Sequence, residues 1–448
     1  NSAIHKPCQE PSLTTSNELL DLRIILLNQL KFSSTYLDKF SDFFQYTFVD
    51  KALNLLHSLN IQTRLGGFYL FYYSIVGTFM PYWNLYLQDQ GFNYKQIGIL
   101  SSIAIITRFF APLIWGWIAD KSGKRMLLVR IATWMEACIW FAIFIIPNSF
   151  QSIALLMLVF SFFQNAILAQ FEGVTLFWLG EKRAELYGKV RKWGSVGFIV
   201  GVFAIGALLE IIPISMLPIL LLSVSFLAFL WSFSIKEPEH APSSQKRLEP
   251  LLPILKRPMV AAFFGIEFIL LFSQAPFYSF YSNFLKEIGF STMQIGTLWA
   301  TGVIAEIVMF AVAQKVFFIR FSWRTLVAAC LILTSLRWLL VGMLNTHFIG
   351  QLLAQCLHAF SFGLFHLIAM KVIFQNFSAE QQGRGQALYS TMWGLGVASG
   401  SLLAGHYWQI LSGATIFLCA SVVVLLGLIL VVWLPNQIET TASKLNQS

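Results

Sequence analysis

The 448-residue chain has few charged residues: Asp, Glu, Lys and Arg make up 11% of it, against about 25% in an average soluble domain. Hydrophobic residues make up 57%. Such a chain has too few polar side chains to cover a water-facing surface, so most of its outer surface is expected to face lipid. The composition therefore excludes an ordinary soluble domain, and the net charge of +9 is interpreted through membrane topology and not through nucleic-acid binding.

The sequence also lacks the usual signatures of catalysis and of metal binding. Its five cysteines are scattered, without a CxxC pair, and are expected to be packing residues. It contains no HExxH, GxSxG or Walker motif and no His/Cys metal spacing. We therefore expect neither an enzyme nor an ATP-driven pump, and no metal or organic cofactor.

Long apolar runs are what the sequence does contain, for example LPILLLSVSFLAFLW and ATIFLCASVVVLLGLILVVWL. About 20 apolar residues cross the hydrocarbon layer as a helix, whereas membrane strands need a strict alternation that these runs do not have. The predicted fold class is an all-α, polytopic membrane protein. Twelve spans are predicted, at residues 65–87, 94–118, 127–147, 152–179, 190–211, 213–235, 259–285, 292–315, 324–345, 348–375, 384–410 and 412–434.

Basic residues are distributed unevenly among the predicted loops. The loops that follow even-numbered spans hold many of them, whereas the loops that follow odd-numbered spans hold only Lys95 and Lys286. Because positively charged loops stay on the cytoplasmic side, both termini are predicted to be cytoplasmic. An even number of spans agrees with this, because it places both termini on the same side of the membrane.

The longest predicted loop, KEPEHAPSSQKRLEPLLPILKRP at 236–258, is rich in Pro, Ser and charge and is predicted to be a cytoplasmic linker. It separates a six-helix bundle at 62–235 from a second one at 259–436, which a cytoplasmic tail at 437–448 follows. Residues 1–60 mix apolar residues with frequent charges, without an evident signal peptide. They are predicted to be a cytoplasmic extension, either amphipathic on the membrane face or disordered.

The two predicted bundles resemble each other at a constant offset of 198 residues. The tripeptide QIG at 96–98 matches QIG at 294–296, and Trp140 matches Trp338. Parallel repeats of six spans around a site near the bilayer midplane are typical of transporters that work by alternating access.

The loop after the second predicted span reads GWIADKSGKR. Its second glycine allows a tight turn, and its aspartate is placed to pair with cytoplasmic cations or with a neighbouring helix start. The pattern resembles the signature of the major facilitator superfamily. The resemblance implies a gating motif made of Gly116, Asp120, Gly123, Lys124 and Arg125.

A narrower resemblance covers roughly residues 62 to 436. The stretch YGKVRKWGSVGF at 187–198 is similar to the start of the fifth helix in the lactose permease-like proton symporters and in the phenylpropionate transporter group beside them. That group also has an Arg in its second helix, a Glu in the eighth, Arg-Trp in the ninth and His…His-Leu-x-Ala-Met in the tenth. The matching residues here are Arg108, Glu306, Arg337, Trp338, His358 and His366.

The chain departs from the permease pattern in two ways. Ala369 and Met370 stand where the permease has a Glu after its histidine, so its proton chemistry is not expected to carry over unchanged. Glu136 and Glu267 have no counterpart in the pattern, and their role stays open.

Four residues are predicted to form a proton-coupling network: Glu306, Arg337, His358 and His366. The first three fall in the middle third of their spans, where an ionised side chain is costly unless it is paired or faces water. Because a His or a buried Glu can exchange a proton near neutral pH, Glu306 is expected to be the coupling carboxylate, tuned by Arg337 and the histidines. The alternative is a structural ion pair beside two hydrogen-bonded packing histidines.

A second set of residues is predicted to bind substrate. Glu172 and Arg191 suit a polyhydroxylated ligand, as a similarly placed pair in lactose permease does, and Arg108 suits an anionic one. The alternative for Arg191 is an anchor at the cytoplasmic interface. The first and seventh predicted helices add groups that suit a sugar, a nucleoside or an aromatic acid, with an interfacial aromatic belt as the alternative: Tyr82, Trp83, Gln274 and Tyr278.

These features predict a proton-coupled symporter that imports a small organic solute, with the proton as its coupling ion. A proton-coupled exporter on the same fold is the close alternative, and a transport-dead membrane receptor is a more distant one. The protein is expected to act as a monomer in the bacterial inner membrane. Its expected partners are a small-molecule substrate and the bilayer, and no nucleic acid.

Overall fold

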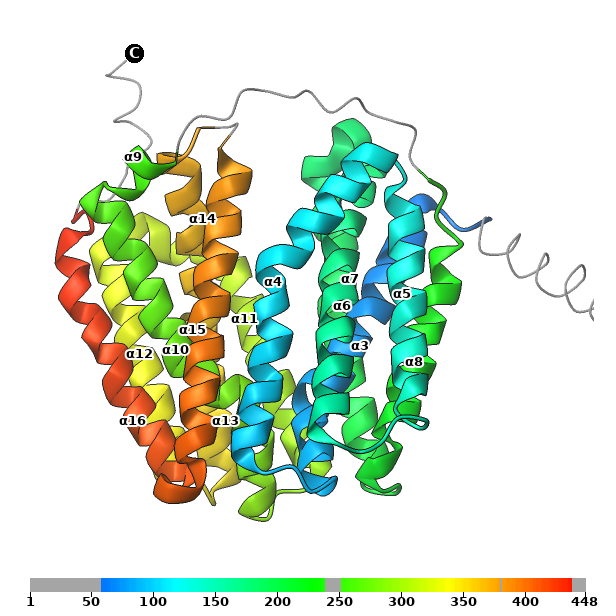
Figure 1. The fold of residues 1–448 in the computed structure, drawn as a ribbon. Helices are drawn as coiled ribbons and strands as arrows, with labels where there is room; N and C mark the ends of the chain where they lie inside the picture. The colour runs from blue at the N-terminus through cyan, green and yellow to red at the C-terminus, as the bar shows by residue number, and fades with distance from the viewer. Residues whose placement is uncertain (1–57, 238–250, 379–380, 437–448) are drawn as a thin grey trace, which may run out of the picture. The chain divides into compact units, whose positions relative to one another are not determined.

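The computed structural model describes residues 58–237, 251–378 and 381–436, and it builds them from helices (Figure 1). The predicted tail and nearly all of the predicted extension at 1–60 lie outside the described residues, as does the middle of the linker. The chain divides after Asn60, and Ile61–Ser448 form a compact unit.

Two sets of helices make up this unit. The N-terminal half contains α3 (Ile61–Asp89), α4 (Tyr94–Ser122), α5 (Arg125–Ala142), α6 (Phe150–Leu179), η2 (Gly180–Lys182), α7 (Arg183–Leu208), η3 (Ile214–Met216) and α8 (Leu217–Ser232). The C-terminal half contains α9 (Leu252–Leu255), α10 (Pro258–Glu287), α11 (Thr292–Arg320), α12 (Trp323–Met343), α13 (Phe348–Cys356), η4 (Ala359–Leu364), α14 (Phe365–Asn376), α15 (Gln382–Leu411), α16 (Gly413–Leu425) and η5 (Leu426–Trp433).

Every predicted span falls on one of these helices or on consecutive helical segments, such as α13–η4–α14 and α16–η5. Within the described parts of the chain, nine helices are long and apolar enough to cross a membrane. The helices α3, α5 and α15 are not among them; α5, for example, carries Arg125, Arg130 and Glu136 within its 18 residues. The structure thus has an all-helical, multi-pass membrane fold, and the number twelve stays a prediction.

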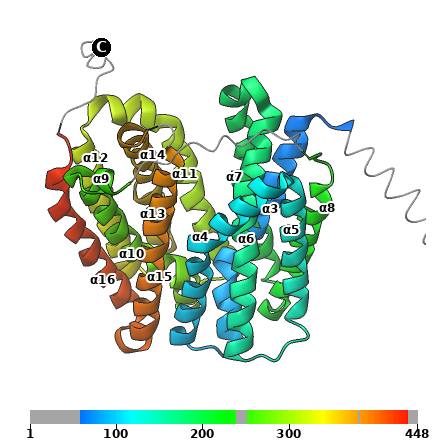
Figure 2. The same cartoon turned by 45° about the horizontal axis from the view of Figure 1, so that its top comes forward.

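Two seams join the halves. The helix α4 lies beside α15, and α7 lies beside α11 (Figures 1 and 2). The helices α3 and α10 also touch. We call the end where α3 leads into α4, at 89–94, and where α10 leads into α11, at 287–292, the closed end.

The internal repeat is confirmed in the local structure of two helix starts. The side chain of Asn93 accepts from the Gln96 N–H at 2.9 Å, and the side chain of Gln96 accepts from the Asn93 N–H at 3.0 Å. Ser291 and Gln294 form the same capping box at the start of α11, at the same offset in sequence. Equivalent residues therefore begin equivalent helices.

The repeated glycines lie at close helix crossings in the two seams. A Cβ on Gly98 would stand 2.7 Å from the carbonyl oxygen of Ser401 in α15. A Cβ on Gly296 would stand 2.9 Å from the carbonyl oxygen of Val202 in α7. Small residues let helix backbones approach this closely in membranes. The repeated QIG tripeptide therefore supplies one close helix crossing to each seam.

Side-chain hydrogen bonds hold the closed end together. The amide of Asn84 donates to the Ser279 carbonyl at 2.6 Å, and the amide of Asn283 donates back to the Asn84 carbonyl at 2.9 Å. The hydroxyl of Tyr94 donates to the carboxylate of Glu287. All of these bonds join the N-terminal half to the C-terminal half.

A carboxylate from one half also caps a helix of the other. Glu210, two residues beyond the end of α7, accepts from the Thr292 hydroxyl at 2.7 Å and from the Met293 N–H at 2.8 Å. A carboxylate at a helix N-terminus is favourable for the helix dipole. The Met293 N–H and then the Thr292 hydroxyl stabilise the ionised form, so the pKa of Glu210 lies below its usual value.

Candidate functional site

A cavity of about 590 Å³ lies between the two halves. Its walls come from α3, α4, α6 and α7 on one side, and from α10, α11, η4, α14 and α15 on the other. The cavity therefore touches both seams. Among the residues that line it are these sequence-predicted ones: Arg108, Glu172, Arg191, Tyr278, Glu306, His358 and His366.

Arg337 of α12 lies behind the cavity wall, at the centre of a buried network. Its guanidinium donates to Gln355 Oε1 at 2.8 Å, to Ser361 Oγ at 2.9 Å and to His358 Nδ1 at 3.0 Å. It also lies over the ring of Phe277, 4.3 Å from the ring centroid. Arg337 is fully buried. Its charge is thus held by three acceptors and by an aromatic face.

His358 lies between Arg337 and Glu306. Because a guanidinium only donates, His358 Nδ1 accepts, and the ring carries its proton on Nε2. This Nε2 faces Glu306 Oε2 at 3.9 Å, which is longer than a hydrogen bond. The side chain of Glu306 is 20% exposed, in the cavity. The structure therefore arranges the predicted network as a row of three groups, in which the carboxylate and the guanidinium do not touch.

The helix that carries both histidines is irregular. Ala359–Leu364 form a π-helical segment, η4, between α13 and α14. The rings of His358, Phe362 and His366 stack in a column, with centroids 5.5 Å and 5.7 Å apart. His366 Nδ1 meets the hydroxyl of Tyr389 at 3.0 Å. Segments of π-helix are rare and are frequent at functional sites, and the sequence pattern did not indicate this one.

Glu172 and Arg191 line the opposite wall, where each is oriented by a tyrosine. Arg191 donates to the hydroxyl of Tyr73 and lies over its ring, 4.4 Å from the centroid. The hydroxyl of Tyr187 donates to Glu172 at 3.3 Å. Within the described residues no ion pair joins Glu172 to Arg191. They are two separate polar groups on the cavity wall.

Arg108 of α4 is held differently. Its guanidinium lies over the indole of Trp393 in α15, 4.2 Å from the ring centroid, and this cation–π contact crosses from one half to the other. No hydrogen bond or ion pair of Arg108 occurs among the described residues. Its N–H donors are therefore available to an acceptor in the cavity.

Tyr82, Trp83 and Gln274 do not line the cavity. The hydroxyl of Tyr82 donates to the Val202 carbonyl at 2.8 Å, and the amide of Gln274 donates to the Ser361 carbonyl at 3.0 Å. Trp83 is 2% exposed in an aromatic cluster. These contacts serve packing and the joining of helices, and a direct contact with substrate stays a prediction for all three.

The predicted gating motif lies at the end of α4 that is opposite the closed end. Gly123 terminates α4 in the left-handed conformation, with φ of 65°. Arg125 pairs with Asp120 at 2.7 Å, but both side chains are more than a third exposed, so the pair stabilises little. Lys124 is the N-cap residue of α5, and a Cβ on Gly116 would meet nothing within 4 Å. The predicted turn is confirmed, and the gating role stays a prediction.

Sequence reasoning missed several residues that line the cavity. Tyr389 and Trp393 come from α15, Tyr73 comes from α3, and Gln164 and Asn165 come from α6. One signal was available in the sequence: Tyr389 and Trp393 are four residues apart, so they share one face of their helix. Their contacts with residues of other helices, however, leave no pattern in the local sequence.

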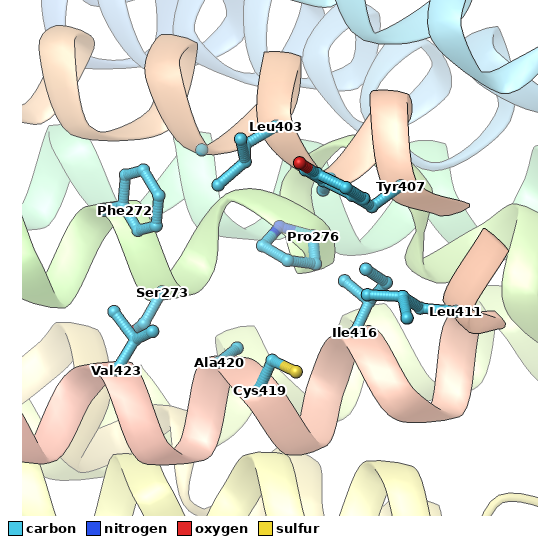
Figure 3. Close-up of a pocket in the computed structure, with 12 residues that line it drawn as sticks. Phe272, Ser273, Pro276, Leu403, Tyr407, Leu411, Ile416, Cys419, Ala420 and Val423 are labelled. Carbon is cyan, nitrogen blue, oxygen red and sulfur yellow. The ribbon is translucent and has the colours of Figure 1, made fainter. Parts of the chain in front are cut away.

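A second cavity, of about 200 Å³, lies between α10, α15 and α16 (Figure 3). Pro276 of α10, Tyr407 of α15 and Cys419 of α16 face it. Its lining residues carry no charge and are mostly apolar. It therefore has none of the acid–base groups that the larger cavity contains.

Two repeated helical halves around a central cavity that contains charged side chains are typical of secondary membrane transporters. Comparison with known families agrees with this class. A model of the MFS_1 like family matches residues 62–419, and the chain belongs to this family of the major facilitator superfamily.

The relatives are transporters of different solutes. The chain is 27% identical to the probable 3-phenylpropionic acid transporter of Escherichia coli (strain K12), over 80% of this chain and 93% of that protein. It is 25% identical to the maltose permease of Geobacillus stearothermophilus, over 85% of this chain and 97% of that one. The solved structure of the nucleoside transporter NupG aligns with a TM-score of 0.68 at 16% identity, over 84% and 98% of the two chains. This last likeness shows the fold alone.

Proposed function

We propose that the protein is a proton-coupled symporter that takes up a small organic solute by alternating access. The position of Glu306 carries the proposal. This carboxylate lies on the wall of the central cavity, 20% exposed, and faces the Nε2–H side of His358 at 3.9 Å. Arg191 lies on the opposite wall of the same cavity. Glu306 can therefore exchange a proton with cavity water while its charge is felt by both halves.

The coupling follows from the cost of a charge in the membrane. An ionised Glu306 without a strong partner resists enclosure in a closed, dry cavity, whereas a protonated Glu306 does not. The carrier that holds both proton and solute can then close and reorient. Arg337 fixes the tautomer of His358, whose Nε2–H is directed at Glu306 and favours the ionised form when the proton leaves.

We assign the solute to the aromatic acids, one of the three classes that the sequence allows. Arg108 offers free N–H donors beside the Trp393 indole, and a carboxylate can accept two of them while its ring packs on an aromatic face. The cavity volume of about 590 Å³ suits a small molecule. The name of the Escherichia coli relative supports the same class.

The proposal includes the predicted topology: twelve spans in the bacterial inner membrane, both termini cytoplasmic, and a monomer as the working unit. On this topology the closed end faces outward and the motif around Asp120 faces the cytoplasm. The structure then corresponds to the state in which the outer side is shut.

Proton uptake by de-energised cells tests the proposal. Cells that express the protein are kept in weak buffer, and external pH is followed as aromatic acids, disaccharides or nucleosides are added singly. We expect alkalinisation with an aromatic acid, abolished by Glu306→Gln. The control variant Glu185→Gln changes an exposed carboxylate that pairs with Lys189 and should transport as the wild type does.

Each other outcome overturns a named part of the proposal. Alkalinisation that survives in Glu306→Gln would move the proton site elsewhere. Alkalinisation with a sugar or a nucleoside alone would refute the aromatic-acid class. No signal in cells, together with proton-driven solute accumulation in inverted vesicles, would make the protein an exporter.

A further inference from the structure

Asn165 of α6 lines the central cavity, and two neighbours fix the orientation of its side-chain amide. Asn165 Nδ2 donates to the hydroxyl oxygen of Thr107 in α4 at 2.8 Å and to the carbonyl oxygen of Ser161 at 2.7 Å. The Thr107 hydroxyl donates its own proton to the Ala104 carbonyl at 2.9 Å, so toward Asn165 it only accepts. A backbone carbonyl only accepts as well. Both neighbours therefore require the nitrogen, and not the oxygen, at this end of the amide.

The carbonyl oxygen of Asn165 is the other end of this amide, and it lacks a donor. Among the described residues nothing donates to Asn165 Oδ1. Unlike the carboxyl oxygens of Glu267, which are also without a partner, it is not sealed inside the protein. Because the residue lines the cavity, the oxygen is accessible from there. An acceptor with a fixed orientation on a cavity wall is suited to a donor group of the solute.

The preceding residue, Gln164, is held in a similar way. Its amide nitrogen donates to Glu136 of α5, which is fully buried, and Gln164 itself lines the cavity. Glu136, whose role the sequence left open, thus positions an amide of the cavity wall. Two successive residues of α6 therefore direct their amide nitrogens toward acceptors of the protein.

The Asn165 acceptor lies next to a group that donates. Its partner Thr107 directly precedes Arg108 in α4, so both ends of this hydrogen-bonding pattern belong to one part of the wall. An ammonium group of a solute would lie beside a guanidinium of the same sign, which is unfavourable. The cavity carboxylate of the same helix, Glu172, is seven residues or about 10 Å farther along α6. A neutral hydroxyl group is therefore the donor that fits this place.

We propose that the solute is a hydroxylated aromatic acid, whose hydroxyl group donates to Asn165 Oδ1 while its carboxylate accepts from Arg108. This inference rests on the solute class of the proposed function and narrows it. A solute without the hydroxyl group leaves an enclosed acceptor unpaired, so it binds less tightly. Thr107 is a positioning residue, because it does not line the cavity but orients the amide that does.

Binding of matched ligands tests the inference without a proton gradient. Titration calorimetry is done on the full chain in lipid nanodiscs with phenylpropionic acid and its derivatives that carry one hydroxyl group on the ring or the side chain. We expect at least one of them to bind about tenfold more tightly than the parent acid. Its methyl ether keeps the oxygen but cannot donate, so it should lose this gain. An ether that binds as tightly, or an amine in place of the hydroxyl that binds more tightly, would overturn the inference.

Variants then locate the preference for the hydroxyl group, expressed as the Kd of the parent acid divided by that of the hydroxylated acid. Asn165→Leu should reduce this ratio to about one, because the acceptor is gone. Thr107→Val removes the hydroxyl that orients the amide and should lower the ratio, whereas Thr107→Ser keeps that hydroxyl and should retain it. Asn148→Leu changes an exposed asparagine outside the cavity and is the matched control. A ratio that survives in Asn165→Leu refutes the inference.

The outcomes separate this inference from the proposed function. If the wild type binds none of the aromatic acids, the solute class of the proposed function fails, and this inference fails with it. If it binds the parent acid and every hydroxylated derivative with the same Kd, only the hydroxyl group is refuted. If Asn165→Leu is poorly folded, as judged by size-exclusion chromatography, the Thr107 variants decide: equal ratios in Thr107→Val and Thr107→Ser overturn the inference.

Discussion

Each half of the protein carries an arginine within a long helix, α4 or α12, and the two arginines are held in opposite ways. Arg337 is fully buried, and its guanidinium donates to three side chains of its own half. Arg108 lies on the cavity wall, over an aromatic ring of the other half, and makes no hydrogen bond or ion pair with the described residues. A guanidinium bound to three acceptors of its own half organises its surroundings, whereas one without a hydrogen-bond partner among the described residues is suited to a ligand.

The difference extends to the two walls of the cavity. In the C-terminal half a buried network positions His358 against Glu306, so the acid–base groups are fixed. In the N-terminal half Glu172 and Arg191 are separate and reach into the cavity, each beside a tyrosine. Under the proposed function, the C-terminal wall binds and releases the proton, and the N-terminal wall contacts the solute.

The largest effect is expected from Arg337→Gln. The variant loses charge-assisted hydrogen bonds to buried acceptors, at about 1.5–3 kcal/mol each. We expect a lower Tm by several degrees and no driven uptake, as measured by thermal unfolding of the purified protein and by solute accumulation. Arg337→Lys should fail as well, because one ammonium cannot reproduce the planar fork. A Lys variant with normal Tm and uptake would contradict this account of the network.

Arg108→Gln should leave stability nearly unchanged and weaken binding. The residue makes no hydrogen bond within the described structure, so the loss falls on the solute: about 1.5–3 kcal/mol, or roughly 10- to 100-fold in Kd. Titration calorimetry with an aromatic acid measures this loss. The methyl ester of the same acid serves as the control, since it should bind both proteins equally weakly. Equal weakening of acid and ester by Arg108→Gln would show that the charge is not what Arg108 recognises.

Much of the fold was predictable because it depends on local patterns. Apolar runs located the helices, and the repeated QIG tripeptide located two equivalent helix starts that the capping boxes of Asn93 and Ser291 confirm. The turn at Gly123 followed from glycine's access to the left-handed conformation. The predicted spans at α3, α5 and α15 are helical but are not among the nine helices of the described residues that are long and apolar enough to cross a membrane, so their membrane crossing stays a prediction.

The site was predictable only in part, because it is made by contacts between distant segments. The sequence singled out Arg108, but nothing local indicates that Trp393, far along the chain, covers it. The π-helical segment η4 brings His358 and His366 into one stacked column, and no periodicity in the sequence marked it. Tyr82, by contrast, was predicted to contact substrate, but its hydroxyl donates to the Val202 carbonyl of α7 and the residue does not line the cavity.

The two seams, α4–α15 and α7–α11, should respond alike to the same substitution of their repeated glycine. Gly98→Ala and Gly296→Ala each place a methyl group against a backbone carbonyl, at about 1–3 kcal/mol for the overpacking. Both should shift the protein away from the state in which the closed end is shut. Gly383→Ala is the control, since its methyl group meets nothing nearby.

Labelling of a cavity cysteine measures this shift. Ser195→Cys, in a chain without native cysteines, places a thiol in the cavity lining. A membrane-impermeant reagent added outside should label it faster in both seam variants than in the control. Faster labelling in only one of them would show that the two seams do not share the closure equally.

The smallest effect is expected from Glu210→Gln, which removes the carboxylate cap of α11 at the closed end of the α7–α11 seam. The carboxylate caps α11, and such a contact with the helix dipole contributes roughly 0.3–1 kcal/mol, or up to about fivefold in the closed-to-open ratio. Because hydrogen bonds from Met293 and Thr292 lower the pKa of Glu210, the contribution is complete above the ordinary Glu pKa of about 4.3. It is lost as pH falls through the lowered pKa. The labelling rates of wild type and Glu210→Gln should therefore differ at neutral external pH and converge in strongly acidic medium. A difference that does not depend on pH would mean that the shape of the side chain, and not its charge, holds this seam.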